Sequence, residues 1–276
     1  MRLLTQRLEI DRAPRASVVA GSLLLVAALT GLGVAVGLAG PALAGSGPGL
    51  GHAFASGVVH AGFLSAGWIL ALGGLGRWQG PAIRGSGALV IASLAAYFSP
   101  AGAVSYLFIP LILARDAAVW HIRLERAGWC LPRDRRAPFL GAAAGIFLGV
   151  HMLFTASLML GYPVTVPDGR RYLAAVAYDI GASAVTAEWL FRGAIFSALW
   201  RRWSFWPAAL ASTGLSLMRY LLDPALPRTA ELMAGAMFYT LLLGLGSCAL
   251  RGWSGSLLPG YLATVAFFAA YRVLHV

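Results

Sequence analysis

The chain has 276 residues, of which 59% are hydrophobic and only 11% are charged. Soluble domains use roughly 25% charged residues, so this composition excludes an ordinary soluble protein and indicates an integral membrane protein. The net charge of +11 could suggest nucleic-acid binding, but the arginines that carry it lie in short clusters between apolar segments, which is typical of cytoplasmic loops.

The first apolar segment, residues 16–38, follows four arginines between residues 2 and 15. It ends near "ALAG", a sequence that resembles a signal-peptidase site. The hydrophobic part of a signal peptide is about 7–15 residues long, and this segment is longer. We therefore expect an uncleaved first span with a cytoplasmic N-terminus.

Further apolar segments of spanning length follow along the chain. They are residues 52–75, 138–161, 173–199, 206–222, 232–250 and 256–272. The stretch 86–114 contains Pro100 and Pro110 and has arginines on both flanks, so it is either one long broken helix or, as the flanking charges favour, a hairpin turning at "FSPAG". The sequence thus predicts an all-α polytopic membrane bundle of about eight transmembrane helices.

The distribution of arginines also predicts the topology. It places the loop 115–137, Arg201, Arg202 and Arg251 on the cytoplasmic side, and the loop 163–171 on the outer side. We expect a multi-pass protein of the bacterial inner membrane. The two cysteines show no disulfide framework or metal-ligand spacing, and we expect neither a metal nor a cofactor.

Four ionisable residues lie within the apolar segments: Asp179, Glu188, Arg192 and Arg219. Each costs about 2.5–3.5 kcal/mol on insertion scales, so each is a candidate functional residue. Glu188 and Arg192 are four residues apart and can form an ion pair on one helix face, either for packing or for chemistry. Asp179 lies nine residues before Glu188, about 180° away on an unbroken helix, which would give the two carboxylates separate sites.

Other polar residues have competing interpretations. Asp179 is expected near the outer interface, where it would accept hydrogen bonds from nearby backbone or from Arg170 or Arg171. His60 and His151 lie within apolar segments, and an isolated intramembrane histidine is commonly a hydrogen-bonded packing residue. Either histidine could instead converge with one of the buried carboxylates.

The stretch "AEWLFRG", residues 187–193, resembles the EExxxR motif of the CPBP family, which contains the CAAX prenyl proteases and bacteriocin-associated immunity proteins. "LSLMRY" falls in the place of the family's FxxxH motif. "LLLGLGSCALRGWSGSLLPGYLATVAFF" resembles its glycine-rich span, "TGSL" turn and final helix. The resemblance covers roughly residues 170–270. It implies CPBP-like core helices over 138–276 and an N-terminal membrane region with the arginine-rich loop over 1–137, in one membrane domain overall.

In this family, a glutamate and two histidines gather within the bundle and activate water for peptide cleavage. The first motif glutamate corresponds to Ala187, the second to Glu188, and the motif arginine to Arg192. The two histidine positions correspond to Arg219 and Thr264. Alanine cannot accept a proton, and arginine stays protonated in proteins. The resemblance therefore implies a degenerate active site in which Glu188 and Arg192 are retained.

The leading functional hypothesis is a non-proteolytic homologue, a pseudoenzyme that binds or regulates a membrane protein or lipidated peptide and has no nucleic-acid partner. One alternative is an active endopeptidase that uses Glu188 with a histidine from the N-terminal half. Another is a small transporter or lipid-handling protein in which Glu188, Arg192 and Arg219 line a polar cavity. Independently of the function, we expect these three residues to form one buried charged cluster between the helices of residues 173–199 and 206–222.

Overall fold

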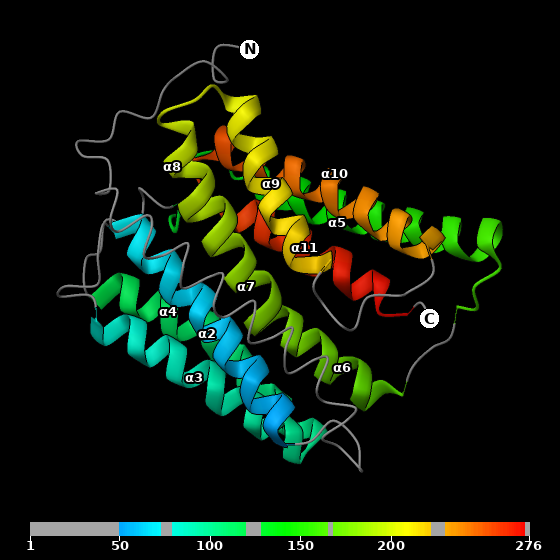
Figure 1. The fold of residues 1–276 in the computed structure, drawn as a ribbon, viewed down its shortest axis with the longest axis horizontal. Helices are drawn as coiled ribbons and strands as arrows, with labels where there is room; N and C mark the ends of the chain where they lie inside the picture. Colours follow the sequence, from blue (N-terminus) through cyan, green and yellow to red (C-terminus); the bar gives the residue numbers. More distant parts are fainter. Residues whose placement is uncertain (1–49, 73–78, 120–127, 165–167, 222–229, 274–276) are drawn as a thin grey trace.

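The computed structural model describes residues 50–72, 79–119, 128–164, 168–221 and 230–273, and the regular elements in these ranges are helices (Figure 1). In chain order they are α2 (Leu50–Leu72), α3 (Gln79–Phe98), the 3-10 helix η3 (Pro100–Leu107), α4 (Phe108–Val119), α5 (Ala137–Phe154), η5 (Thr155–Met159), α6 (Gly169–Tyr178), η6 (Asp179–Ser183), α7 (Ala184–Ala187), η7 (Glu188–Phe196), α8 (Ser197–Trp200), α9 (Phe205–Leu221), α10 (Ala230–Ser254) and α11 (Leu258–Tyr271). The expected first span, residues 16–38, lies outside the described residues.

Several helices are suited by length and composition to cross a bilayer. Among the described residues, the stretches Ala53–Ala71, Ala137–Met159 and Met233–Ser254 are long and apolar enough, and Ala82–Phe98 and Leu258–Tyr271 are shorter apolar helices. The helices begin and end within a few residues of most of the segments predicted from the sequence. The total of eight spans stays a prediction, because part of the chain lies outside the described ranges.

The stretch predicted as a hairpin does turn at "FSPAG". The backbone N–H of Gly102 donates to the carbonyl of Ser99 at 2.8 Å, and a side chain at Gly102 would collide with the carbonyl of Ala95 on α3. Arg84, near the start of α3, forms an ion pair with Asp116, near the end of α4, at 2.8 Å between Nη2 and Oδ1. This contact shows that α4 returns along α3.

A central helical run, residues 169–200, passes through the middle of the bundle (Figure 1). It alternates between α-helical and π-helical segments, and the π-helical segments η6 and η7 begin at Asp179 and Glu188. A π turn contains an extra residue, and each extra residue rotates the following part of the helix by about 100°. The 180° separation was predicted for an unbroken helix and does not apply to this run. The two carboxylates nevertheless have separate partners, Arg272 for Asp179 and Arg192 for Glu188.

One side of the central run packs against α2. The rings of Trp189 and Trp68 meet edge to face with centroids 4.9 Å apart, and Trp189 Nε1 donates to the carbonyl of Leu64 at 3.0 Å. Gly67 lies directly under the Trp189 ring, where an added side chain would clash. The close approach of α2 thus seals this side of the central run with apolar contacts.

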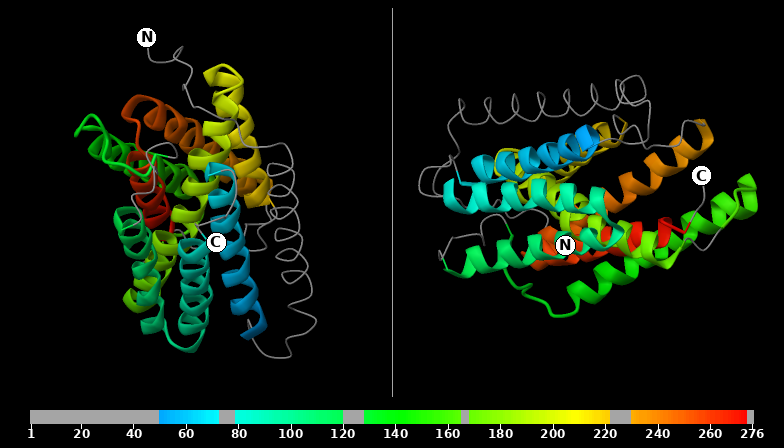
Figure 2. Two further views of the ribbon diagram at one scale, coloured as in Figure 1. Left: turned by 90° about the vertical axis from the view of Figure 1, so that its left-hand side faces the viewer. Right: turned by 90° about the horizontal axis from the view of Figure 1, so that it is seen from below.

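The other side of the central run faces α11, which is held by α5 (Figure 2). Gly141, Gly145 and Gly149 occur at every fourth position of α5, and the first two bring its backbone against the carbonyls of Pro259 and Ala263. Small residues at this spacing allow helices in membranes to approach closely. The glycine stripe thereby fixes α11 in place behind the central run.

The end of the arginine-rich loop is attached to the turn that precedes α11. The backbone N–H of Leu257 donates to the carbonyl of Gly128 at 2.7 Å, and that of Arg133 donates to the carbonyl of Ser254 at 3.0 Å. The buried side chain of Arg251 donates to the carbonyl of Gly255, whose φ of 73° favours glycine. These bonds set the position where α11 begins.

Candidate functional site

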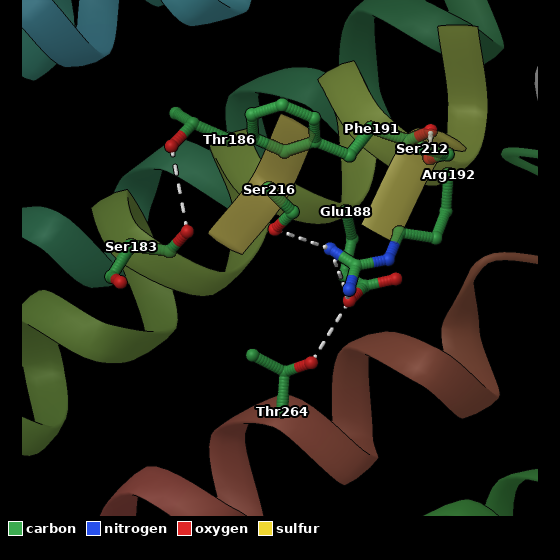
Figure 3. A network of polar contacts seen from close by, with 8 residues as sticks. All are labelled: Ser183, Thr186, Glu188, Phe191, Arg192, Ser212, Ser216 and Thr264. Atoms are coloured by element: carbon green, nitrogen blue, oxygen red, sulfur yellow. Dashed lines mark hydrogen bonds and ion pairs between the residues drawn. The ribbon is translucent and has the colours of Figure 1, made fainter. Parts of the chain in front are cut away.

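Glu188 and Arg192 lie at the centre of a buried polar cluster (Figure 3). Both belong to η7, and their exposed fractions are 1% and 5%. Arg192 Nη1 lies 3.7 Å from Glu188 Oε1, so the two form the ion pair expected from their spacing. At this burial neither charge is solvated by water, and each depends on the other for stabilisation.

Two neighbouring helices contribute hydroxyl groups to this ion pair. Thr264 of α11 donates from Oγ1 to Glu188 Oε1 at 2.9 Å, and Arg192 Nη1 donates to Oγ of Ser216 on α9 at 3.2 Å (Figure 3). Thr264 is the position that the resemblance predicts for the last histidine of the family. The structure thus brings Glu188 and Arg192 of η7 together with Thr264 of α11. The groups that bond this ion pair from the neighbouring helices are hydroxyl groups.

Several buried polar atoms around the pair have no hydrogen bond of normal geometry among the described residues. They are Glu188 Oε2, Arg192 Nε, Thr213 Oγ1 and Ser247 Oγ. A side-chain carbon placed on Gly260 would lie 2.9 Å from Glu188 Oε2 and 3.1 Å from Ser247 Oγ, which shows how tightly α11 closes over this group. The Ser247 hydroxyl still interacts with the Glu188 carboxylate, so the cluster is closely packed but its hydrogen bonds are imperfect in geometry.

The contacts described for Ala187 and Arg219 are with Phe63 of α2. Ala187 is buried in an apolar cluster with Phe63 of α2, on another side of the central run. The guanidinium carbon of Arg219 stands 5.3 Å from the centre of the Phe63 ring, a cation–π geometry. The described contacts join Glu188 to Arg192 and place Arg219 over the Phe63 ring. The prediction that Arg219 completes a three-residue charged cluster stays a prediction.

His60 is buried in a separate network. Its Nδ1 lies 3.1 Å from Thr186 Oγ1 and its Nε2 lies 2.7 Å from the Tyr178 hydroxyl. Thr186 donates its own proton to the carbonyl of Ala182 at 2.6 Å, so it must accept from Nδ1–H of the histidine. Tyr178 then donates to the unprotonated Nε2. Both ring nitrogens are occupied, and the network does not include Glu188.

An open pocket of about 280 Å³ lies next to the His60 network, between α2, α3, η3 and α6. Its lining residues are Ala53, Ser56, Ser93, Ala96, Tyr97, Ala103, Tyr106, Ala174 and Tyr178. No charged residue lines it, and none of the residues that contact Glu188 does. This pocket is therefore separate from the charged cluster.

His151 also lies away from the buried carboxylates. Its Nδ1 is 2.6 Å from the Tyr239 hydroxyl, which joins α5 to α10, and its side chain is exposed on the outer surface of the bundle. Neither described histidine side chain therefore contacts Glu188 or Asp179. Within the described residues, no group of three or more His, Cys, Asp or Glu side chains is placed to hold a metal ion.

Asp179 has a partner that sequence reasoning missed. Its two carboxylate oxygens accept from Arg272 Nε and Nη2 at 2.9 and 2.8 Å. The expected contact with Arg170 or Arg171 is wrong, because the end of α11 lies beside the start of η6 and brings Arg272 to the carboxylate. The position of Arg272 at the very end of the last apolar segment was the available sequence signal, since charges often mark the end of a span.

Residues 170–269 match the family model described as type II CAAX prenyl endopeptidase, Rce1-like. The match contains η7, α9, α10 and most of α11, which together hold the polar cluster. It confirms the resemblance to the CPBP family, and with the helical architecture it identifies a polytopic, CAAX-protease-like membrane protein. Comparisons with curated proteins and with solved structures gave no match.

Proposed function

We propose that this CPBP-family chain does not cleave peptide bonds and instead binds or regulates a membrane-protein partner. The observation that carries the proposal is the environment of Glu188. Its Oε1 atom is bonded by Arg192 and by Thr264, at a position where the family uses an imidazole. The retained carboxylate is thus held by a permanent cation and a hydroxyl group.

General acid–base catalysis requires a group that exchanges protons near neutral pH, close to the reacting water. A guanidinium group does not exchange protons near neutral pH, and a threonine hydroxyl is neither a general base nor a ready acid at that pH. Ala187 offers only a methyl group in an apolar environment. These side chains support a role for Glu188 in holding η7 and α11 together. An active endopeptidase would need an imidazole beside Glu188, whereas His60 and His151 are bonded elsewhere.

A cleavage assay tests the first half of the proposal. The purified chain is offered prenylated and unprenylated membrane peptides, with and without divalent metal ions, alongside a Glu188→Gln variant. We expect intact peptides in every reaction. Cleavage by the natural chain that is lost in the variant would overturn the proposal and make Glu188 a catalytic residue.

Co-purification from native membranes tests the second half. The chain is solubilised in mild detergent and the proteins that remain bound to it are identified by mass spectrometry. We expect a membrane protein in stoichiometric amount. Recovery of the chain alone under several mild detergents would contradict a partner-binding role.

The orientation is also part of the proposal: a bacterial inner membrane protein with the loop 115–137 in the cytoplasm. In a background with both natural cysteines replaced by serine, a cysteine replaces either Arg135 or Val164. We expect an impermeant thiol reagent added to intact cells to label the Val164→Cys variant and to leave Arg135→Cys unlabelled. The reverse pattern would invert the topology.

A further inference from the structure

His151 is a polar residue on the outer surface of an apolar helix. It lies on the stretch Ala137–Met159, which is long and apolar enough to span a bilayer, and its side chain is exposed. It follows Ala137 by 14 residues, a rise of about 21 Å, which is inside a hydrocarbon layer about 30 Å thick. A polar group exposed at this depth is costly unless a partner satisfies it.

The hydrogen bonds around His151 indicate which ring nitrogen carries the proton. Thr155 donates its single proton to the carbonyl of His151 at 2.9 Å, so its Oγ1 accepts from the Tyr239 hydroxyl at 3.1 Å. The Tyr239 proton is then used, and its oxygen accepts from His151 Nδ1 at 2.6 Å. Nε2 is left as an acceptor, and no described residue bonds it. The complementary group is therefore a hydrogen-bond donor.

His151 also lies in a continuous row of exposed side chains along α5. The row consists of Leu140, Ala144, Phe147, His151 and Phe154, which are spaced alternately four and three residues apart. This spacing forms the seam of a left-handed helix pair, in which a single polar residue fixes the register. The opposite side of α5 is already occupied by α11 at the glycine stripe, so the exposed row is the side available to another helix.

We propose that this row on α5 is the docking surface for one transmembrane helix of a partner protein, and that this helix carries a hydroxyl or carboxamide donor at the depth of His151. The inference rests on the proposed partner-binding function and names the surface that performs it. Phe147 and Phe154 supply the apolar contact on either side. His151 Nε2 accepts the hydrogen bond that selects the partner and its register.

The test measures binding between the full-length chain and synthetic transmembrane peptides in nanodiscs, by fluorescence energy transfer. One peptide has a leucine–alanine core with a single asparagine at the depth of His151, and the other has leucine at that position. Interhelical hydrogen bonds in membranes contribute modestly, so we expect the asparagine peptide to bind about threefold to tenfold more tightly. The His151→Leu variant should bind both peptides equally.

A matched variant controls for the mere presence of an exposed imidazole. In the His151→Leu background, Ile146→His places a histidine on another exposed position of α5, outside the row. This variant should not restore the preference for asparagine. Equal binding of both peptides to the natural chain would overturn the proposal, as would restoration by Ile146→His.

Two further measurements distinguish this proposal from self-association of the chain and from peptide cleavage. Self-association of the natural chain that His151→Leu abolishes would overturn the proposal, because a second copy would then occupy the row. The masses of the peptides after binding report on cleavage. Cut peptides would refute the non-proteolytic function. The docking surface would then still be confirmed or refuted by the measured preference for the asparagine peptide over the leucine peptide.

Discussion

The two buried carboxylates of the central run differ in how completely they are bonded. Asp179 shares both oxygens with Arg272, whose side chain is 35% exposed and reaches the edge of the bundle. Glu188 is equally buried, at 1% exposed, and its Oε1 is bonded by Arg192 and Thr264. Its Oε2 makes no hydrogen bond of normal geometry, although Ser247 interacts with the carboxylate. Both carboxylates begin π-helical segments and face α11. One contact is a complete ion pair, and the other is an incomplete cluster.

This difference indicates separate roles. A fully satisfied ion pair at a helix end fixes the packing of α11 against the central run and needs no further explanation. A deeply buried carboxylate with an unbonded oxygen is costly in a low dielectric, and such groups are commonly retained for a functional reason. Here the family match covers the part of the chain that contains Glu188, and the resemblance of residues 187–193 to the family motif predicts that Glu188 occupies a motif position.

Removal of the Glu188 carboxylate should have the largest effect. Glu188→Ala leaves the Arg192 guanidinium buried without its counter-ion, which typically costs about 3–5 kcal/mol in the free energy of unfolding. Adding Arg192→Leu should recover part of this loss. Reversible unfolding in mixed micelles, followed by circular dichroism, measures both. Additive losses would mean that the two side chains do not interact in the folded state.

Substitutions in the Asp179–Arg272 pair should lower the free energy of unfolding by less, and the loss should depend on which partner is replaced. Arg272→Ala leaves a carboxylate that is 1% exposed without a partner, and we expect a loss of about 2–3 kcal/mol. Asp179→Asn should cost less, because the Arg272 guanidinium can turn toward water. The same unfolding measurement ranks the two variants. A larger loss for Asp179→Asn would contradict the edge position of this pair.

Gly260→Ala tests how closely α11 packs over the Glu188 cluster. The added methyl group would lie 2.9 Å from Glu188 Oε2 and 3.1 Å from Ser247 Oγ, and we expect overpacking to cost about 1–3 kcal/mol. The control is Gly246→Ala on α10, where no atom lies within 4 Å and alanine should be neutral or stabilising. Equal stabilities of the two variants would refute the close contact at Gly260.

Thr264→Val should give the smallest change. It removes one hydrogen bond to Glu188 and keeps the side-chain shape, and Arg192 still holds the same oxygen. We expect a loss of about 1 kcal/mol in the free energy of unfolding. Thr264→Ser keeps the hydroxyl and should stay nearer to the natural chain. Unfolding of the two variants side by side decides whether the Thr264 hydroxyl contributes at all.

Much of the architecture followed from the sequence, because long apolar segments between arginine clusters have few alternatives to membrane helices. The hairpin at "FSPAG" was also predictable, since two prolines and arginines on both flanks favour a reversal. The pairing of Glu188 with Arg192 followed from their four-residue spacing. Each of these features depends on residues close together in the chain.

The rest of the polar cluster was not predictable from spacing. Ser216, Ser247 and Thr264 lie on three different helices, and small hydroxyl residues are too common in membrane helices to single out. Asp179 was assigned to the wrong arginines because its partner, Arg272, is 93 residues away in sequence. The π turns also escaped prediction, since a hydropathy pattern does not report an extra residue within a helical turn.

The sequence by itself determined that this chain is a helical membrane protein, that a carboxylate and a guanidinium are buried within it, and that its C-terminal part resembles a protease family. The tertiary structure decided which groups surround that carboxylate and which histidines are kept away from it. The physical reason is that apolarity and charge bias act along the chain, whereas hydrogen bonds to Glu188 and Asp179 depend on the rotation and close approach of α11. That approach is set by the glycine stripe of α5 and by π turns in the central run.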